Sequence, residues 1–185
     1  MIILVVLAAA IALALLRGGR LGNLAALNIR WRGIIIVGFL IQVLIFSSYW
    51  QEKSETRSLT QFAYLASLCL LLVALAANHR IPGMKLITLG FFLNFLAIAV
   101  NGGYMPASPA ALQMSKLPLL GPGDVSNNSI GMGPDTRLPF LSDIFAIPKE
   151  IIFSNVFSVG DVLIAFGAVY LIQKALMTPP TLPRT

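Results

Sequence analysis

Six charged residues, most of them of types that could take part in acid–base chemistry, lie close together in the stretch 133–167. They are Asp135, Arg137, Asp143, Lys149, Glu150 and Asp161. Two carboxyl groups that share one proton can act as a general acid and a general base that together activate water. Asp161, combined with either Asp143 or Asp135, therefore gives the sequence a candidate catalytic pair.

The same residues also have uses that need no catalysis. Asp161 or Ser158 would cap the start of the apolar helix that follows, where the helix dipole favours negative charge. Arg137 would need a partner in surroundings of low dielectric, and Asp135, Asp143 or Asp161 could form a bidentate ion pair with it. Such a pair would fix this segment onto the helices or form the floor of a site for a lipid headgroup. Catalytic, ligand-binding and structural interpretations all stay open.

Asparagines extend this group into a larger predicted polar cluster. Its members are Asn101, Asn128, Arg137, Asp143, Asn155 and Asp161. The chain has one cysteine, Cys69, and one histidine, His79, so clusters of cysteine or histidine ligands and Ser-His or Cys-His pairs cannot be built. The sequence predicts neither a metal site nor a cofactor.

Composition assigns the chain to the membrane class. Hydrophobic residues make up 57% of its 185 residues and charged residues 11%, against roughly 45–50% and ~25% in soluble domains. Five segments are apolar enough to predict membrane-spanning helices, which need ~20 residues each. They are 1–16, 33–50, 59–78, 86–100 and 155–176. We expect an all-α, polytopic membrane protein with one membrane domain over 1–185.

The charges predict the orientation of these spans. With the N-terminus outside, the inner segments 17–32, 79–85 and 174–185 hold eight of the thirteen basic residues and none of the seven acids. This bias follows the positive-inside rule and places the C-terminus in the cytoplasm. The net charge of +6 is then a topology signal beside anionic lipid. Membrane lipids, and possible further membrane subunits, are the expected partners, and nucleic acid is not.

The segment 102–154 lies outside in this topology. It is too apolar for a loose linker, and its prolines and glycines forbid one long helix. A structureless loop of this length would be unusual. We expect an ordered cap of short helices and turns that packs over the helices.

Several motifs resemble those of a family of bacterial multi-pass membrane proteins of unknown function. The matching blocks are NGGYMP at 101–106, GPDTRL at 133–138, LSDIF at 141–145 and NVFSVGD at 155–161. The resemblance covers nearly the whole chain. It implies a multi-pass protein of the bacterial plasma membrane and supplies no activity.

A second resemblance concerns the acidic blocks alone. The stretch 157–161, which ends in Asp161 and precedes an apolar helix, is similar to the last catalytic block of the lipoprotein signal peptidases, which are membrane aspartyl proteases. Asp135 to Leu138, with Asp143 downstream, is similar to their earlier block. The chain departs from that pattern because Thr136 separates Asp135 from Arg137, and because four spans are usual in those enzymes. This resemblance implies a catalytic pair of aspartates.

Two functions follow as expectations. The first is a non-enzymatic membrane protein that binds a lipid or hydrophobic ligand, or that serves as an accessory subunit of a larger membrane complex. The alternative is an outer-face membrane aspartyl hydrolase that uses Asp161 with Asp143 or Asp135.

Overall fold

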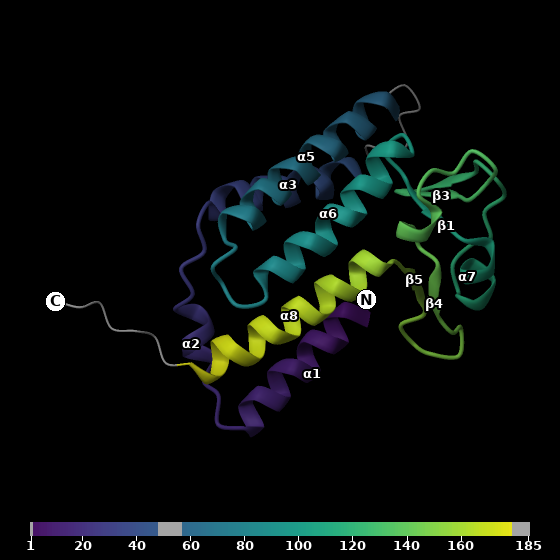
Figure 1. Cartoon of the computed structure of the whole chain (residues 1–185). Coiled ribbons are helices and arrows are strands. Elements are labelled where there is room, and N and C mark those ends of the chain that lie inside the picture. The colour runs from purple at the N-terminus through teal and green to yellow at the C-terminus, as the bar shows by residue number, and fades with distance from the viewer. Residues whose placement is uncertain (1, 48–56, 179–185) are drawn as a thin grey trace.

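Long helices form most of the molecule. The computed structural model describes residues 2–47 and 57–178. Five longer helices lie side by side in it (Figure 1). They are α1 (Ile2–Leu16), α3 (Arg32–Ile45), α5 (Arg57–Ala77), α6 (Met84–Val100) and α8 (Val159–Met177). The short helix α2 (Leu21–Ala25) follows α1.

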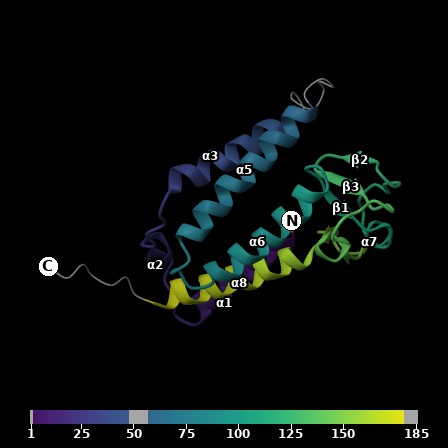
Figure 2. The same ribbon diagram turned by 45° about the horizontal axis from the view of Figure 1, so that its top comes forward.

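The five long helices pack in two groups, and all of them run between the same two ends of the molecule. Helices α1, α8 and α6 lie together (Figures 1 and 2). Helices α3 and α5 pack against each other, and α5 also packs against α6. The starts of α1, α5 and α8 lie at the same end of the molecule as the ends of α3 and α6 (Figure 1). At the opposite end, the backbone of Arg20 donates to the Leu176 carbonyl, and that of Arg30 donates to the Asn78 side chain.

Helices α6 and α8 approach one another through facing glycines. Gly90 faces Gly160, and Gly83 faces Gly167. The spacing is seven residues on both sides, from the N-cap Gly83 to Gly90 of α6 and from Gly160 to Gly167 of α8. The two antiparallel helices therefore keep one register over two contacts. A Cβ atom on Gly160 would lie 2.5 Å from the Gly90 carbonyl oxygen, which leaves no room for a side chain. Small residues at such a crossing allow backbones to pack closely.

The segment after α6 folds into an ordered cap, which we define as residues 101–158. It contains short strands, the helix α7 (Pro109–Met114) and the 3-10 turn η2 (Pro139–Leu141). Strands β1 (Met105–Ala107), β3 (Ser129–Gly131) and β2 (Val125–Ser126) form one sheet in that spatial order. Strands β4 (Phe145–Ile147) and β5 (Asn155–Phe157) form an antiparallel pair.

The prediction of an all-α fold with a cap of helices and turns is therefore wrong in the cap. Proline and glycine recur too often there for a helix longer than α7. The remaining backbone groups pair between short strands instead, which satisfies donors and acceptors that would otherwise be buried without partners. An isolated bridge between Ala107 and Asp143 links β1 to the segment just before β4.

The predicted spans correspond to helices whose lengths differ. Over Ser58–Ala77 of α5 and along all of α8, the chain is long and apolar enough to cross a membrane. The other three are shorter apolar helices. Helix α8 begins later than the predicted span 155–176, because 155–157 forms β5. Helix α3 ends at Ile45, earlier than the predicted span 33–50. Positions 1 and 48–50 of the predicted spans lie outside the described residues.

Candidate functional site

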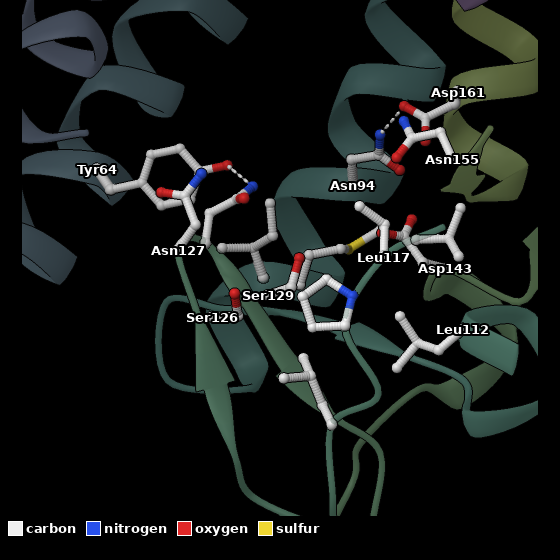
Figure 3. A pocket seen from close by; sticks show the side chains of 16 residues that line it. Tyr64, Asn94, Leu112, Leu117, Ser126, Asn127, Ser129, Asp143, Asn155 and Asp161 are labelled. Carbon is white, nitrogen blue, oxygen red and sulfur yellow. Dashed lines mark hydrogen bonds between the residues drawn. The ribbon is translucent and has the colours of Figure 1, made fainter. Parts of the chain in front are cut away.

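A polar pocket of ≈ 430 Å³ lies where the cap meets α5, α6 and α8 (Figure 3). Helix residues form one side of it and cap residues the other. The polar side chains that line it are Tyr64, Asn94, Ser126, Asn127, Asn128, Ser129, Asp143, Asn155 and Asp161. Four members of the predicted polar cluster, the two asparagines 128 and 155 and the two aspartates 143 and 161, thus share one pocket.

Asp161 is held by the start of α8. The Ser158 backbone N–H donates to Asp161 Oδ2 at 2.9 Å, and the Asp161 backbone N–H donates to Ser158 Oγ at 3.0 Å. This reciprocal pair is a capping box, which satisfies two of the free N–H groups at a helix start. The predicted N-cap is therefore present, with Ser158 as the capping residue.

Asn94 of α6 completes the support of Asp161 from the neighbouring helix. Its Nδ2 donates to Asp161 Oδ1 at 2.9 Å (Figure 3). Its Oδ1 lies 2.7 Å from the Ser158 hydroxyl, which can donate to it. The side-chain nitrogen of Asn94 and the backbone nitrogen of Ser158 can only donate, so both Asp161 oxygens act as hydrogen-bond acceptors.

Asp143 is held in the pocket by its backbone. Its N–H donates to the Pro106 carbonyl at 2.9 Å, and its own carbonyl accepts from the Ser108 N–H at 2.9 Å. These bonds attach it to strand β1, and its side chain is 9% exposed. Burial, and secondly the nearby charge of Asp161, raise the pKa of Asp143 from its ordinary 3.8 to about 7. Near neutral pH a large part of Asp143 therefore carries its proton.

Asp135, Arg137 and Asn101 lie elsewhere. They line a separate pocket of ≈ 480 Å³ on the other side of β3, where Asp135 and Arg137 are exposed. Asn101 binds the Arg137 backbone, because its Oδ1 accepts from the Arg137 N–H at 2.9 Å and its Nδ2 donates to the Arg137 carbonyl at 2.8 Å.

The predicted ion pair between Arg137 and an aspartate is wrong for residues 2–47 and 57–178, where the guanidinium is exposed and no carboxylate pairs with it. The prediction assumed a buried arginine, whereas the chain turns at Leu138, which has a positive φ of 51°, and leaves the side chain outside the cap. Within the described part of the chain, no three His, Cys, Asp or Glu residues come together as a metal site.

Two residues of the pocket were not foreseen. Asn94 lies within the apolar segment 86–100, and a lone amide in such a run is the signal that could have identified it, because polar groups at that depth face protein. Tyr64 of α5 is buried (Figure 3), and its hydroxyl lies 3.5 Å from Asn128 Nδ2. Its sequence context does not distinguish it from a packing aromatic.

An apolar pocket of ≈ 490 Å³ adjoins the polar one. The two pockets share Asn155, Val156 and Asp161. The other lining residues of the apolar pocket come from α1, β4, β5 and α8: Val6, Ile147, Phe157, Val162, Ala165, Phe166 and Val169.

The comparisons identify a family and no activity. A family of unknown function, DUF5317, has a model that matches residues 26–173. The match covers helices α3, α5 and α6, the cap, α8 up to residue 173, and every lining residue of the polar and apolar pockets except Val6. No curated protein and no solved structure shows a significant match to the chain.

Proposed function

The chain belongs to the DUF5317 family of unknown function, and we propose its function from the site itself: a membrane hydrolase with Asp143 and Asp161 as its acid–base pair. The observation that carries the proposal is that these two carboxyl groups, and not Asp135, line one pocket. One of them is held as a hydrogen-bond acceptor, and the other, buried, retains its proton near neutral pH. Such an unequal pair is what water activation by two carboxyls requires.

The proposal includes a location in the bacterial plasma membrane, with all five long helices as spans, the N-terminus outside and the C-terminus cytoplasmic. Helices α5 and α8 are long enough to cross, and the shorter three pack beside them. Large apolar side chains point outward from the bundle: Phe39, Leu40, Val43, Phe62 and Phe166 are each more than half exposed. A lipid environment would cover them. The arginines that follow α1 and precede α3 gather at the end opposite the cap, which suits the cytoplasmic side.

In the first step, water adds to the carbonyl group of an ester or amide. The Asp161 carboxylate removes a proton from the water while the water oxygen forms a bond to the carbonyl carbon. The protonated Asp143 gives its proton to the carbonyl oxygen. The product is a neutral tetrahedral diol, and the charges of the two aspartates are exchanged.

In the second step, the tetrahedral species breaks down. Asp161 returns its proton to the leaving nitrogen or oxygen as the bond from that atom to carbon breaks. Asp143 takes a proton from one hydroxyl as the carbonyl re-forms. The net reaction adds one water to the substrate, releases an acid and an amine or alcohol, and restores both carboxyls.

Asn94 and Ser158 are positioning residues in this scheme. Their hydrogen bonds fix the Asp161 carboxylate relative to α6 and α8. The glycine contacts of the same two helices bring Asn94 within reach, because a side chain on Gly160 would collide with Asn94 Oδ1. Precise placement of a catalytic group lowers the entropic part of a barrier.

The test uses oxygen-18 water, because the mechanism puts the water oxygen into the acid product. The purified protein in nanodiscs is incubated with total bacterial membrane lipids and membrane peptides, and mass spectrometry identifies acids that gain one heavy oxygen. We expect labelled products with the parent and with Asp135→Asn, and none with Asp143→Asn. Equal labelling by the parent and Asp143→Asn would exclude the proposal.

A second candidate is binding of a lipid, hydrophobic ligand or partner subunit without turnover. It is favoured by one observation: the Asp161 carboxylate has a structural use in the capping box, which needs no chemistry. On this proposal the oxygen-18 experiment gives no labelled product, while Asp161→Asn lowers the stability of the fold.

A further inference from the structure

The apolar pocket is suited to bind the apolar part of an amphiphilic molecule. Among the described residues that line it, Asn155 and Asp161 carry the polar side chains, and both also line the polar pocket. From that shared boundary it continues along α8 past Val162, Ala165 and Val169. A molecule with a polar group at Asp161 would thus have an apolar wall on one side and a polar pocket on the other.

We propose that this pocket binds the hydrocarbon chain of an amphiphilic substrate and presents the carbonyl beside that chain to Asp161. The inference rests on the proposed hydrolase and specifies its substrate class: an acyl lipid or acylated molecule whose bond to be cleaved lies at the junction of its polar and apolar parts.

The arrangement of the walls favours a hydrocarbon chain over a polar peptide. Four separate elements contribute apolar side chains: Val6 comes from α1, Ile147 from β4, Phe157 from β5 and Phe166 from α8. A peptide backbone in this pocket would find too few polar partners for its amide groups, which is costly. A chain that moves from lipid into the pocket exchanges one apolar environment for another and loses no hydrogen bonds.

The proposed membrane position provides the route of access. Phe166 is both a wall of the pocket and 66% exposed on the surface of α8. The pocket therefore reaches the bundle surface that would face lipid. A chain could move in sideways from the bilayer while its headgroup stays at the cap, which orients the carbonyl before reaction.

The test measures chain binding separately from hydrolysis. The Asp143→Asn protein is delipidated in detergent and titrated with an ether-linked hexadecyl lysophospholipid, which has no ester bond to cleave, and bound lipid is counted by native mass spectrometry. A second substitution, Ala165→Trp, fills the pocket. The matched control is Val43→Trp, which adds the same ring at a 69% exposed position of α3.

We expect one retained lipid with Asp143→Asn and with the control, and at least a tenfold loss of affinity with Ala165→Trp. Equal retention by all variants would overturn the chain site. If Ala165→Trp does not fold, a diazirine placed on the chain is cross-linked to the Asp143→Asn protein. Adducts on 157–169 that unlabelled lipid competes away support the inference, and uniform labelling of all exposed helices overturns it.

Failure of this inference and failure of the proposed hydrolase give different results. Lipid that is lost with Ala165→Trp, combined with no oxygen-18 product from the parent, leaves the chain site valid and removes the hydrolase. Oxygen-18 product from the parent, combined with unchanged lipid retention in Ala165→Trp, leaves the hydrolase and removes the chain site.

Discussion

Four of the charged residues in 135–161 form two groups with opposite surroundings. Asp143 and Asp161 line the pocket between cap and helices, and burial and mutual charge raise the pKa of Asp143. Asp135 and Arg137 lie on the outer surface of the cap, where both are exposed. Only the first group combines restricted access to water with fixed hydrogen bonds.

The difference comes from the backbone and not from residue type. Asp143 follows η2, and its backbone bonds to Pro106 in the middle of β1 and to Ser108 just after β1, so its side chain lines the pocket. Arg137 is bonded through its backbone to Asn101, which leaves its side chain outside. Of the two cap aspartates considered, Asp143 is a candidate catalyst because its backbone is bonded to β1, whereas Asp135 lies on the exposed surface.

The largest expected effect tests this division directly. Asp143→Asn should lower hydrolysis on the order of 10²–10⁴-fold, because an amide cannot donate and recover a catalytic proton. Asp135→Asn makes the same chemical change on the exposed surface and should leave the rate within twofold. The measurement is the initial rate of oxygen-18 incorporation in nanodiscs. Equal losses in both variants would mean that the two groups do not differ in function.

The glycine contact between α6 and α8 gives the largest expected effect on stability. Gly160→Ala would bring a methyl group against the Gly90 carbonyl and Asn94 Oδ1, so we expect a loss of about 1–3 kcal/mol or more. Gly22→Ala is the matched control, since no atom lies within 4 Å of the added methyl group. Unfolding in mixed detergent micelles measures both. A Gly160→Ala protein as stable as the parent would show that the two helices are not in tight contact.

The positions of the helices could be predicted from the sequence, whereas the strands of the cap could not. Apolar runs located the five long helices, and Ser158 with Asp161 indicated the start of α8, because these signals are local. The sequence left open whether Asp143 or Asp135 lies near Asp161. The presence of Asp143 in the pocket of Asp161 depends on a bridge from Ala107 to Asp143 across 36 positions of chain.

Other features of the site were beyond any local signal. The strands of the cap have two or three residues each, too few for an alternating pattern. The support of Asp161 by Asn94 requires the register of α6 on α8, which only the glycine contacts specify. The exposure of Arg137 follows from the turn at Leu138 and is not encoded in the arginine itself.

The pH dependence of stability tests the buried position of Asp143 against the exposed position of Asp135. The folded protein keeps the Asp143 proton up to about pH 7, whereas the unfolded chain releases it near 3.8. The stability due to this proton is therefore fully present below about pH 4 and is lost as pH rises through 7. Asp143→Asn should lose less stability than the parent between pH 5 and pH 8, as measured by unfolding at the two pH values. Asp135→Asn should retain the parental dependence, and an identical slope in all three proteins would contradict the buried position of Asp143.

The smallest expected effect concerns Arg137. The sequence predicted a buried ion pair, whose disruption by Arg137→Met would cost roughly 3–5 kcal/mol because a charge would be left without a partner. The structure leaves the guanidinium exposed and uses the Arg137 backbone, whose bonds to Asn101 do not depend on the side chain. We therefore expect Arg137→Met to change the free energy of unfolding by no more than about 0.5 kcal/mol, as at other exposed sites. Asn101→Ala removes both backbone contacts of the arginine and should cost more, about 1–2 kcal/mol, because each lost hydrogen bond costs roughly 0.5–1.5 kcal/mol. If Arg137→Met lowered the free energy of unfolding more than Asn101→Ala, the arginine would contribute through its charge. The group of Asp135 and Arg137 could then not be separated from that of Asp143 and Asp161.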